Sequence, residues 1–230
     1  MRRLRNLLLM SIAAIVASSA VSCNKDKPDY SIMYPNALVT MKTNPEGVVY
    51  LQINDEETAS VTNFSTMPFK GKSEVRILGN IEKQEGEDSK GFDYAVKINW
   101  MDSLRTEVMK PSTGDMDKDN AKYGNAPIEI YADPFFTLVE DGYLTIRFST
   151  VFDGVTKHVL SLVPGEKEDE VILHHDAKNN LTGYRGDGII SFRLDKLKMP
   201  DTEKAELKLK WQSFTGGIKE HTFSYVPRKN

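Results

Sequence analysis

Apolar and polar residues alternate with a period of two along most of the chain, which is typical of strands that bury one face. No long stretch places apolar residues at the spacing of a helix. The alternation predicts strands at residues 37–43, 48–53, 75–81, 92–100, 127–131, 143–152, 156–163, 171–175, 188–194, 203–214 and 218–226. Many short strands separated by turn residues are typical of a sandwich or a barrel. We therefore predict an all-β protein.

Turn residues stand between several of these strands. Asn44-Pro45-Glu46-Gly47 has the composition of a type I turn, with Asn first, Pro second and Gly fourth. Asp153-Gly154 predicts a hairpin that joins residues 143–152 to residues 156–163. Gly216-Gly217 predicts a short turn before the last strand.

The strand at residues 92–100 carries an aromatic row. Phe92, Tyr94 and Trp100 share one face with two aliphatic residues, while the other face is polar. Such a row can stack against sugars or bases. A buried core face is the interpretation we favour, because aromatic side chains contribute most to core packing.

Residues 111–124 have neither apolar periodicity nor enough hydrophobic residues to join a core. Pro111, Gly114 and a run of acids make this stretch the best candidate for a linker. It separates two β-rich regions, residues 34–110 and residues 125–230. We found no internal repeat between them.

The N-terminus predicts a lipoprotein signal peptide at residues 1–22. Three arginines precede an apolar core at residues 7–17, and small residues lead to Cys23. The uncharged stretch is shorter than the roughly 20 residues of a membrane span. Ala20-Val21-Ser22-Cys23 fits the motif for cleavage before a cysteine whose thiol is then acylated, for example with palmitate; the alternative is an ordinary signal with an incidental cysteine.

We therefore expect lipid on Cys23 as the attachment to the membrane, followed by a tether over residues 23–33. This predicts a protein of the cell envelope, anchored in the outer membrane. Residues 24–27 are polar but are not an acidic run, so the periplasmic side and the surface side both stay open.

Removal of the signal peptide changes the charge. Lys plus Arg falls from 30 to 27 against 33 Asp plus Glu, so the mature chain carries −6 rather than −3. An acidic protein is a poor partner for nucleic acid, and it lacks a polybasic membrane patch. Cys23 is the only cysteine, so once it is acylated no thiol is left for a disulfide, a zinc site or a nucleophile.

Two motifs invite a metal interpretation. Asp115, Asp117 and Asp119 resemble the start of a calcium loop, but Asn120 and Ala126 occupy the positions where that loop needs Gly and Glu. An irregular calcium site stays open beside the favoured polar linker.

The second motif, His174-His175-Asp176, places neighbouring histidines on opposite faces of a strand, where they cannot easily share one ion. The glycines of residues 178–188 lack the strand-to-helix setting of a phosphate loop and fit a connection between strands. No catalytic signature is present. We predict no metal, cofactor or catalytic residue, and a protein that is not an enzyme.

Asp102-Ser103-Leu104 matches a short O-glycosylation sequon of exported proteins in some anaerobic gut bacteria. In an exported chain this makes Ser103 a candidate for glycosylation.

Several segments, in order over nearly the whole mature chain, carry a family resemblance. They are Tyr34-Pro35-Asn36-Ala37-Leu38-Val39-Thr40, Val96-Lys97-Ile98-Asn99-Trp100-Met101-Asp102-Ser103, Tyr123-Gly124-Asn125-Ala126-Pro127-Ile128-Glu129, Glu140-Asp141-Gly142-Tyr143-Leu144-Thr145-Ile146-Arg147-Phe148, His175-Asp176-Ala177 and Gly186-Asp187-Gly188-Ile189-Ile190-Ser191-Phe192-Arg193-Leu194. These segments resemble the NigD-like lipoproteins. The resemblance implies an N-terminal OB-like barrel, residues 34–110, followed by a C-terminal antiparallel β-sandwich, residues 125–230. The family takes its name from a bacteriocin gene cluster, and it supplies no catalytic residues.

We expect a non-enzymatic envelope lipoprotein that binds a glycan, a peptide or another envelope protein. The first alternative is a bacteriocin-associated accessory or immunity factor. The second is a hydrolase whose site the sequence does not reveal.

Overall fold

The computed structural model describes residues 34–197 and 205–228. Cys23 and the predicted tether lie outside these residues. The elements are β1 (Tyr34–Thr43), β2 (Val49–Gln52), β3 (Thr58–Val61), β4 (Glu74–Lys83), β5 (Tyr94–Ser103), β6 (Thr106–Val108), α1 (Met116–Tyr123), β7 (Glu129–Ile130), β8 (Leu138–Glu140), β9 (Tyr143–Phe152), β10 (Val159–Pro164), β11 (Glu170–Asp176), β12 (Tyr184–Arg193), β13 (Ala205–Ser213) and β14 (Gly217–Tyr225). The all-β prediction is confirmed, with α1 as the one helix among the described residues. That helix is too short to cross a membrane.

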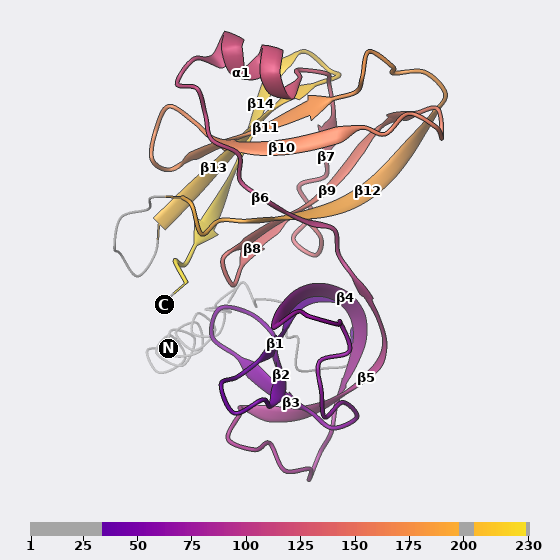
Figure 1. Cartoon of the computed structure of the whole chain (residues 1–230), viewed down its shortest axis with the longest axis vertical. Coiled ribbons are helices and arrows are strands. Elements are labelled where there is room, and N and C mark those ends of the chain that lie inside the picture. The colour runs from indigo at the N-terminus through magenta and orange to yellow at the C-terminus, as the bar shows by residue number, and fades with distance from the viewer. Residues whose placement is uncertain (1–33, 198–204, 229–230) are drawn as a thin grey trace, which may run out of the picture. The chain divides into compact units, whose positions relative to one another are not determined.

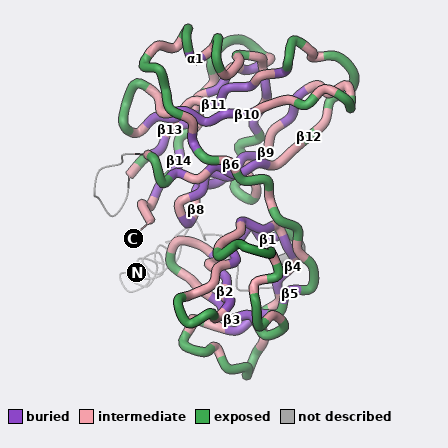
Figure 2. The backbone as a smooth tube through the Cα atoms, in the orientation of Figure 1, coloured by how far each residue is buried: buried purple, intermediate pink, exposed green. Residues whose placement is uncertain are grey.

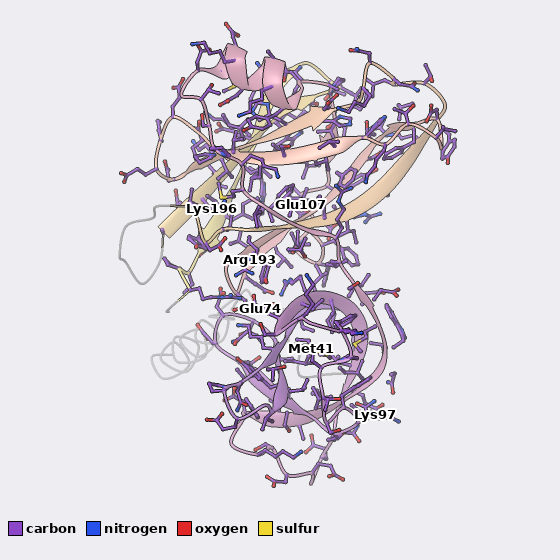
Figure 3. The ribbon with its side chains drawn as sticks, in the orientation of Figure 1. Met41, Glu74, Lys97, Glu107, Arg193 and Lys196 are labelled. Atoms are coloured by element: carbon purple, nitrogen blue, oxygen red, sulfur yellow. The ribbon has the colours of Figure 1, made fainter. Side chains whose placement is uncertain are left out.

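The first five strands form a closed barrel in the order β1-β2-β3-β5-β4 (Figure 1). Strand β1 closes the barrel by pairing with both β2 and β4, and β3 pairs with β5 in parallel. This confirms the predicted OB-like barrel. Alternation sends one set of side chains inward, so Met41 lies inside the barrel while Lys97 lies outside it (Figure 3).

The predicted turn between β1 and β2 is present. The Gly47 amide donates to the Asn44 carbonyl at 2.9 Å. The Val48 amide donates to the Asn44 side-chain oxygen at 2.8 Å. These bonds are why Asn begins the turn and Gly ends it.

The rest of the chain forms a β-sandwich of two sheets. One sheet has the order β10-β11-β13-β14, and the other has the order β6-β12-β9-β7, with β8 also paired to β9. Most pairs are antiparallel, but β11–β13 and β6–β12 are parallel. Buried residues follow the strands and exposed residues follow the loops (Figure 2). The residues fully buried in the core include Ile128, Leu144, Ile146, Leu162, Val171, Phe192, Leu207 and Leu209.

The predicted hairpin of residues 143–152 with residues 156–163 is wrong. Strand β9 pairs with β12, and β10 pairs with β11 in the other sheet. The turn at Asp153 does form, since its side chain accepts hydrogen bonds from the amides of Val155 and Thr156. The chain uses that turn to cross between sheets. Alternation shows which face of a strand is buried, but it does not show which strand lies beside it.

The predicted linker, residues 111–124, contains the helix α1, which packs against β10 and β11 (Figure 1). Asp115 caps its N-terminus by accepting hydrogen bonds from the amides of Asp117 and Lys118. An eight-residue helix has only two turns, which is too short for a clear apolar period. Strand β6, just before this stretch, already pairs with β12 of the sandwich.

We predict that Gly124→Ala destabilises the fold strongly. Gly124 has φ +89°, and a Cβ there would lie 2.5 Å from the backbone of Asp176. We expect a loss of about 3 kcal/mol or more in the free energy of unfolding, measured by urea denaturation. Gly86→Ala is the matched control, because Gly86 has φ +79° with no atom within 4 Å of the added Cβ. We expect this control to lose about 1 kcal/mol in the free energy of unfolding, because a positive φ strains an alanine even where there is space for its Cβ. Equal losses in the two variants would contradict the steric argument.

Candidate functional site

Trp100 lies on the outside of the barrel, which overturns the favoured core interpretation for this residue. Its neighbours Val96 and Ile98 are buried, but the Trp100 side chain is 43% exposed. The cause is a break in register between β4 and β5: Ile81 pairs with Ile98, whereas Asn80 pairs with Trp100. Asn99 is the extra residue of this bulge. One inserted residue reverses the in-and-out order of those that follow.

Asn80 is the cross-strand partner of Trp100, and polar side chains next to this pair bond to one another. Asn99 donates from its amide nitrogen to the side-chain oxygen of Asn80 at 2.7 Å and to a carboxylate oxygen of Glu82 at 3.3 Å. These bonds hold the Asn99 side chain in place. We call the set Asn80, Glu82, Asn99 and Trp100 the Trp100 face. It combines an indole ring with fixed amide groups and a carboxylate, which suits the stacking and hydrogen bonding of a polar ligand that has flat apolar faces.

The other two aromatic residues of the predicted row are half-buried. The Phe92 ring stacks on Tyr50 with centroids 4.9 Å apart. The Lys83 ammonium lies 5.2 Å from the centroid of Tyr94. Both therefore pack against other barrel side chains. Of the three aromatic residues in the row, Trp100 is the one that is available to a ligand.

A second polar cluster joins the barrel to the sandwich. Asp141 and Gly142 form the two-residue turn between β8 and β9, with φ values of 51° and 71°. Positive φ at both residues is the signature of a type I′ turn, which Asp-Gly favours. At the tip of this hairpin the Asp141 carboxylate meets the Lys42 ammonium at 2.6 Å. The Asp141 amide donates to the Asp55 carboxylate at 2.7 Å.

Arg228, just beyond β14, connects the two parts of this cluster. Its guanidinium lies 2.9 Å from a Glu74 carboxylate oxygen and 2.9 Å from an Asp141 oxygen. Glu74 belongs to the barrel strand β4 and is labelled in Figure 3. The Tyr143 hydroxyl also donates to Glu74. We call Lys42, Glu74, Asp141, Tyr143 and Arg228 the junction cluster.

The junction cluster shifts the pKa values of Glu74, Tyr143 and Arg228. Burial alone would raise the pKa of Glu74, but hydrogen bonds from Arg228 and Tyr143 lower it overall. Burial and the Glu74 carboxylate raise the pKa of Tyr143. Burial would lower the pKa of Arg228, but Glu74 and Asp141 raise it. The lowered pKa of Glu74 and the raised pKa of Arg228 both favour the charged forms, which face each other in the cluster.

A pocket of about 330 Å³ lies beside Arg228. It is lined by Gly142, Arg193, Leu194, Asp195, Leu197, Tyr225, Pro227 and Arg228. Arg193 faces Asp195 at 3.6 Å, and Arg228 is engaged by the junction cluster. Both arginines that line the pocket therefore already pair with carboxylates of the protein. The pocket sits at the small end of the range for ligand sites.

Two neighbouring histidines of β11, His174 and His175, are buried in the sandwich. The two neighbours predicted to point apart do so: His174 Nδ1 donates to the Gly124 carbonyl at 3.0 Å, and His175 Nδ1 lies 3.1 Å from the Pro127 carbonyl. The tertiary structure brings in His158, whose Nδ1 is 3.0 Å from His175 Nε2. Burial lowers the pKa of both His174 and His175. Sequence spacing gave no sign of the His158 contact.

Asp115 and Asp119, two acids of the calcium-like motif, accept hydrogen bonds from nearby groups of the protein. Asp119 accepts hydrogen bonds from the Ser112 hydroxyl at 2.6 Å and the Thr113 amide at 2.9 Å. Among the described residues, no three His, Cys, Asp or Glu side chains gather closely enough to hold a metal ion. Ser103 is exposed at the end of β5. Its glycosylation, like lipid on Cys23, stays a prediction.

Residues 109–225, just over half of the chain, match the family model for the NigD-like C-terminal beta sandwich domain. The chain belongs to the NigD-like family. This confirms the resemblance seen in the sequence. No curated protein matches this NigD-like chain in sequence.

Solved structures share the fold of the NigD-like chain. A protein of Parabacteroides distasonis named as toxin-related is 22% identical, with a TM-score of 0.67 over 84% of this chain and 93% of its own. A protein of unknown function from Bacteroides vulgatus is 24% identical, with a TM-score of 0.64 over 85% and 95%. A NigD-like immunity protein from Bacteroides caccae is 22% identical, with a TM-score of 0.57 over 84% and 99%. At these identities the likeness establishes the two-part fold.

We predict that Arg228→Ala loosens the junction of the NigD-like protein. Removing the guanidinium leaves Glu74 and Asp141 facing each other at a partly buried site, which should cost about 3 kcal/mol. Chemical denaturation measures the loss. Arg105→Ala is the control, because Arg105 pairs with Glu107 at an exposed site and should cost about 0.5 kcal/mol or less. A loss at Arg228 as small as that at Arg105 would contradict a structural role for the cluster.

We predict that mild acid destabilises the sandwich. His174 and His175 have pKa values lowered in the folded state, so the unfolded chain binds protons more readily below about pH 6.5. The melting temperature should therefore fall from pH 7.5 to 5.5, before the lowered pKa of Glu74 takes effect below about pH 4.5. His174→Gln should flatten this dependence. A melting temperature that rises toward pH 5.5 would show the sign to be wrong.

Proposed function

We propose that this NigD-like protein is a non-enzymatic binding protein of the cell envelope, tethered by lipid on Cys23, that holds a glycan on its Trp100 face. The observation that carries the proposal is the exposure of Trp100 beside fixed amide groups. Sugar rings offer C–H faces that stack on an exposed indole, and the fixed amides beside it can bond to their hydroxyls.

The groups beside the ring favour a glycan over other ligands. Asn80, Asn99 and Glu82 offer amide donors together with amide and carboxylate acceptors, which matches the neighbouring hydroxyls of a sugar. OB barrels are used for oligosaccharides as well as for nucleic acids. The mature charge of −6 opposes a nucleic acid backbone. Tethering near the membrane places such a protein among envelope and extracellular polysaccharides.

We predict that Trp100→Ala abolishes glycan binding. The mature chain should bind a subset of a bacterial glycan array, and the Ala variant should bind about 10-fold or more weakly, since one stacking contact contributes about 1–3 kcal/mol. Trp100→Phe should retain part of the affinity. Phe135→Ala is the control, because Phe135 is 51% exposed but lies in the sandwich. An array with no specific signal, or equal binding by Trp100→Ala, would refute the proposal. Capture of a peptide or protein through Trp100 would assign a different ligand.

A bacteriocin-associated accessory or immunity role is the second candidate. The names of two structural neighbours favour it, one a NigD-like immunity protein and the other toxin-related. The fold serves either role, because an immunity factor acts by binding and needs no catalytic residues.

Deleting the gene should sensitise the cell to a bacteriocin if this second role is right. Growth inhibition by bacteriocin-containing supernatants measures the change. Complementation with the natural gene should restore resistance, and a Cys23→Ser gene would show whether the anchor is needed. Unchanged sensitivity of the deletion strain would rule out this role.

A further inference from the structure

Two chain connections meet at one end of the sandwich. Residues 153–158 cross from β9 to β10, and residues 177–183 cross back from β11 to β12. Asn180 joins them through its side-chain amide, which donates to Asp153 at 2.6 Å and to the Thr156 hydroxyl at 2.8 Å. The backbone carbonyl of Asn180 also faces Nε2 of His158 at 3.0 Å.

This last contact ends a chain of hydrogen bonds through two imidazole rings. The Pro127 carbonyl lies 3.1 Å from His175 Nδ1. His175 Nε2 lies 3.0 Å from His158 Nδ1. His158 Nε2 then reaches the Asn180 carbonyl. Both ends of the chain are carbonyl oxygens, which accept hydrogen bonds and cannot donate them.

The three contacts need one more proton than two neutral imidazole rings carry. Three hydrogen bonds need three N–H groups, because each of the four ring nitrogens takes part in one bond and the two carbonyls supply no proton. Two neutral imidazoles carry two N–H groups between them. When both rings are neutral, one bond must therefore be lost, with a nitrogen lone pair facing an oxygen or another lone pair. One added proton satisfies all three bonds.

The added proton belongs on His158. His175 is 1% exposed, and burial there opposes a positive charge. A neutral His175 donates from Nδ1 to Pro127 and accepts at Nε2 from His158 Nδ1–H. His158 must then carry its second proton on Nε2 to reach Asn180. Its ring is half-buried and stacks on Phe152, with centroids 5.1 Å apart.

We propose that His158 is a proton-operated clasp: its second proton adds a hydrogen bond to the Asn180 carbonyl beside the two bonds of the Asn180 side chain, and loss of that proton removes this third bond. Because the three hydrogen bonds need one proton more than two neutral rings carry, acid favours the closed clasp. It tightens one end of the sandwich without altering the core. This inference is independent of the glycan proposal.

The charged groups around the two rings are compatible with a cation on His158. Asp153 shares Asn180 with His158, and hydrogen bonds from the Thr156 and Val155 amides hold its pKa low, so it stays negative. Asp176, next to His175, is engaged by Lys178 at 2.5 Å. Lys157 adjoins His158 in the chain and is the nearest cation in sequence. On the other face of β11, His174 is directed to Gly124.

Exposed apolar side chains lie on or next to the two connections that the clasp joins. Val155 is 89% exposed on the first connection, and Tyr184 is 65% exposed where the second enters β12. A Cβ at Gly154 would lie 3.5 Å from the Tyr184 hydroxyl, so this ring reaches the first connection.

Imidazole ¹⁵N NMR of the mature chain tests the proton count directly. At pH 5.5 we expect both nitrogens of His158 to be protonated, while His175 shows one protonated and one bare nitrogen. Amide exchange at residues 177–182, corrected for intrinsic rates and compared with core amides of β9, should be about 10-fold slower at pH 5.5 than at pH 8. A charged His175 beside a neutral His158, or equal corrected exchange at both pH values, would overturn the proposal.

His158→Gln removes the titrating ring while keeping a side chain that can hydrogen-bond. In this variant, exchange at residues 177–182 should no longer depend on pH. His221→Gln is the matched control, because His221 lies on β14 and packs on Phe223; this variant should keep the natural pH dependence. Persistence of that dependence in His158→Gln would count against the clasp. The NMR measurement on the unaltered chain decides the question even if His158→Gln fails to fold.

Discussion

The bridge from Arg228 to Glu74 and Asp141 is the contact on which the two-part structure depends. Removing charges from water is costly, and the cost is recovered only where each charge meets an opposite one with good geometry. Here the guanidinium contacts a barrel carboxylate and a hairpin-tip carboxylate, and Lys42 engages Asp141 as well. The Asp-Gly turn sets the hairpin tip, and the segment after β14 supplies the arginine. Turn, strand and C-terminal segment must all be in place before both Glu74 and Asp141 meet Arg228.

On the barrel, a one-residue irregularity separates core from surface. The alternation that buries Val96 and Ile98 would also bury Trp100 if β5 were regular. The bulge at Asn99 turns the indole outward and pins the Asn99 amide beside it. An exposed indole thus lies directly beside strand residues that stay in the core. Bulges are often found where a strand must redirect one side chain.

The sandwich shows a different use of polar groups. His174 and His175 are buried and each bonds to a backbone carbonyl through Nδ1, while Asp115 caps α1 and Asp119 accepts bonds from Ser112 and Thr113. Hydrogen bonds of this kind specify how loops meet strands. The His158–His175 pair is the exception, because its bonds are complete only when the pair holds an extra proton.

Local patterns in the sequence predict the strands, the first turn and, through the resemblance, the barrel followed by a sandwich. These follow from local rules, since alternation, Asn-Pro-Glu-Gly and family segments are all readable along the chain. These patterns do not show that β9 pairs with β12 instead of β10, that the Trp100 side chain lies outside the barrel, or that His158 contacts His175. Each depends on contacts between residues far apart in sequence: strand partners compete for the same edge, a bulge exists only relative to its neighbour, and two crossovers meet only when the sheets stack. The strand pairing, the outward Trp100 and the histidine contact are seen only in the folded protein, and the candidate sites depend on the last two.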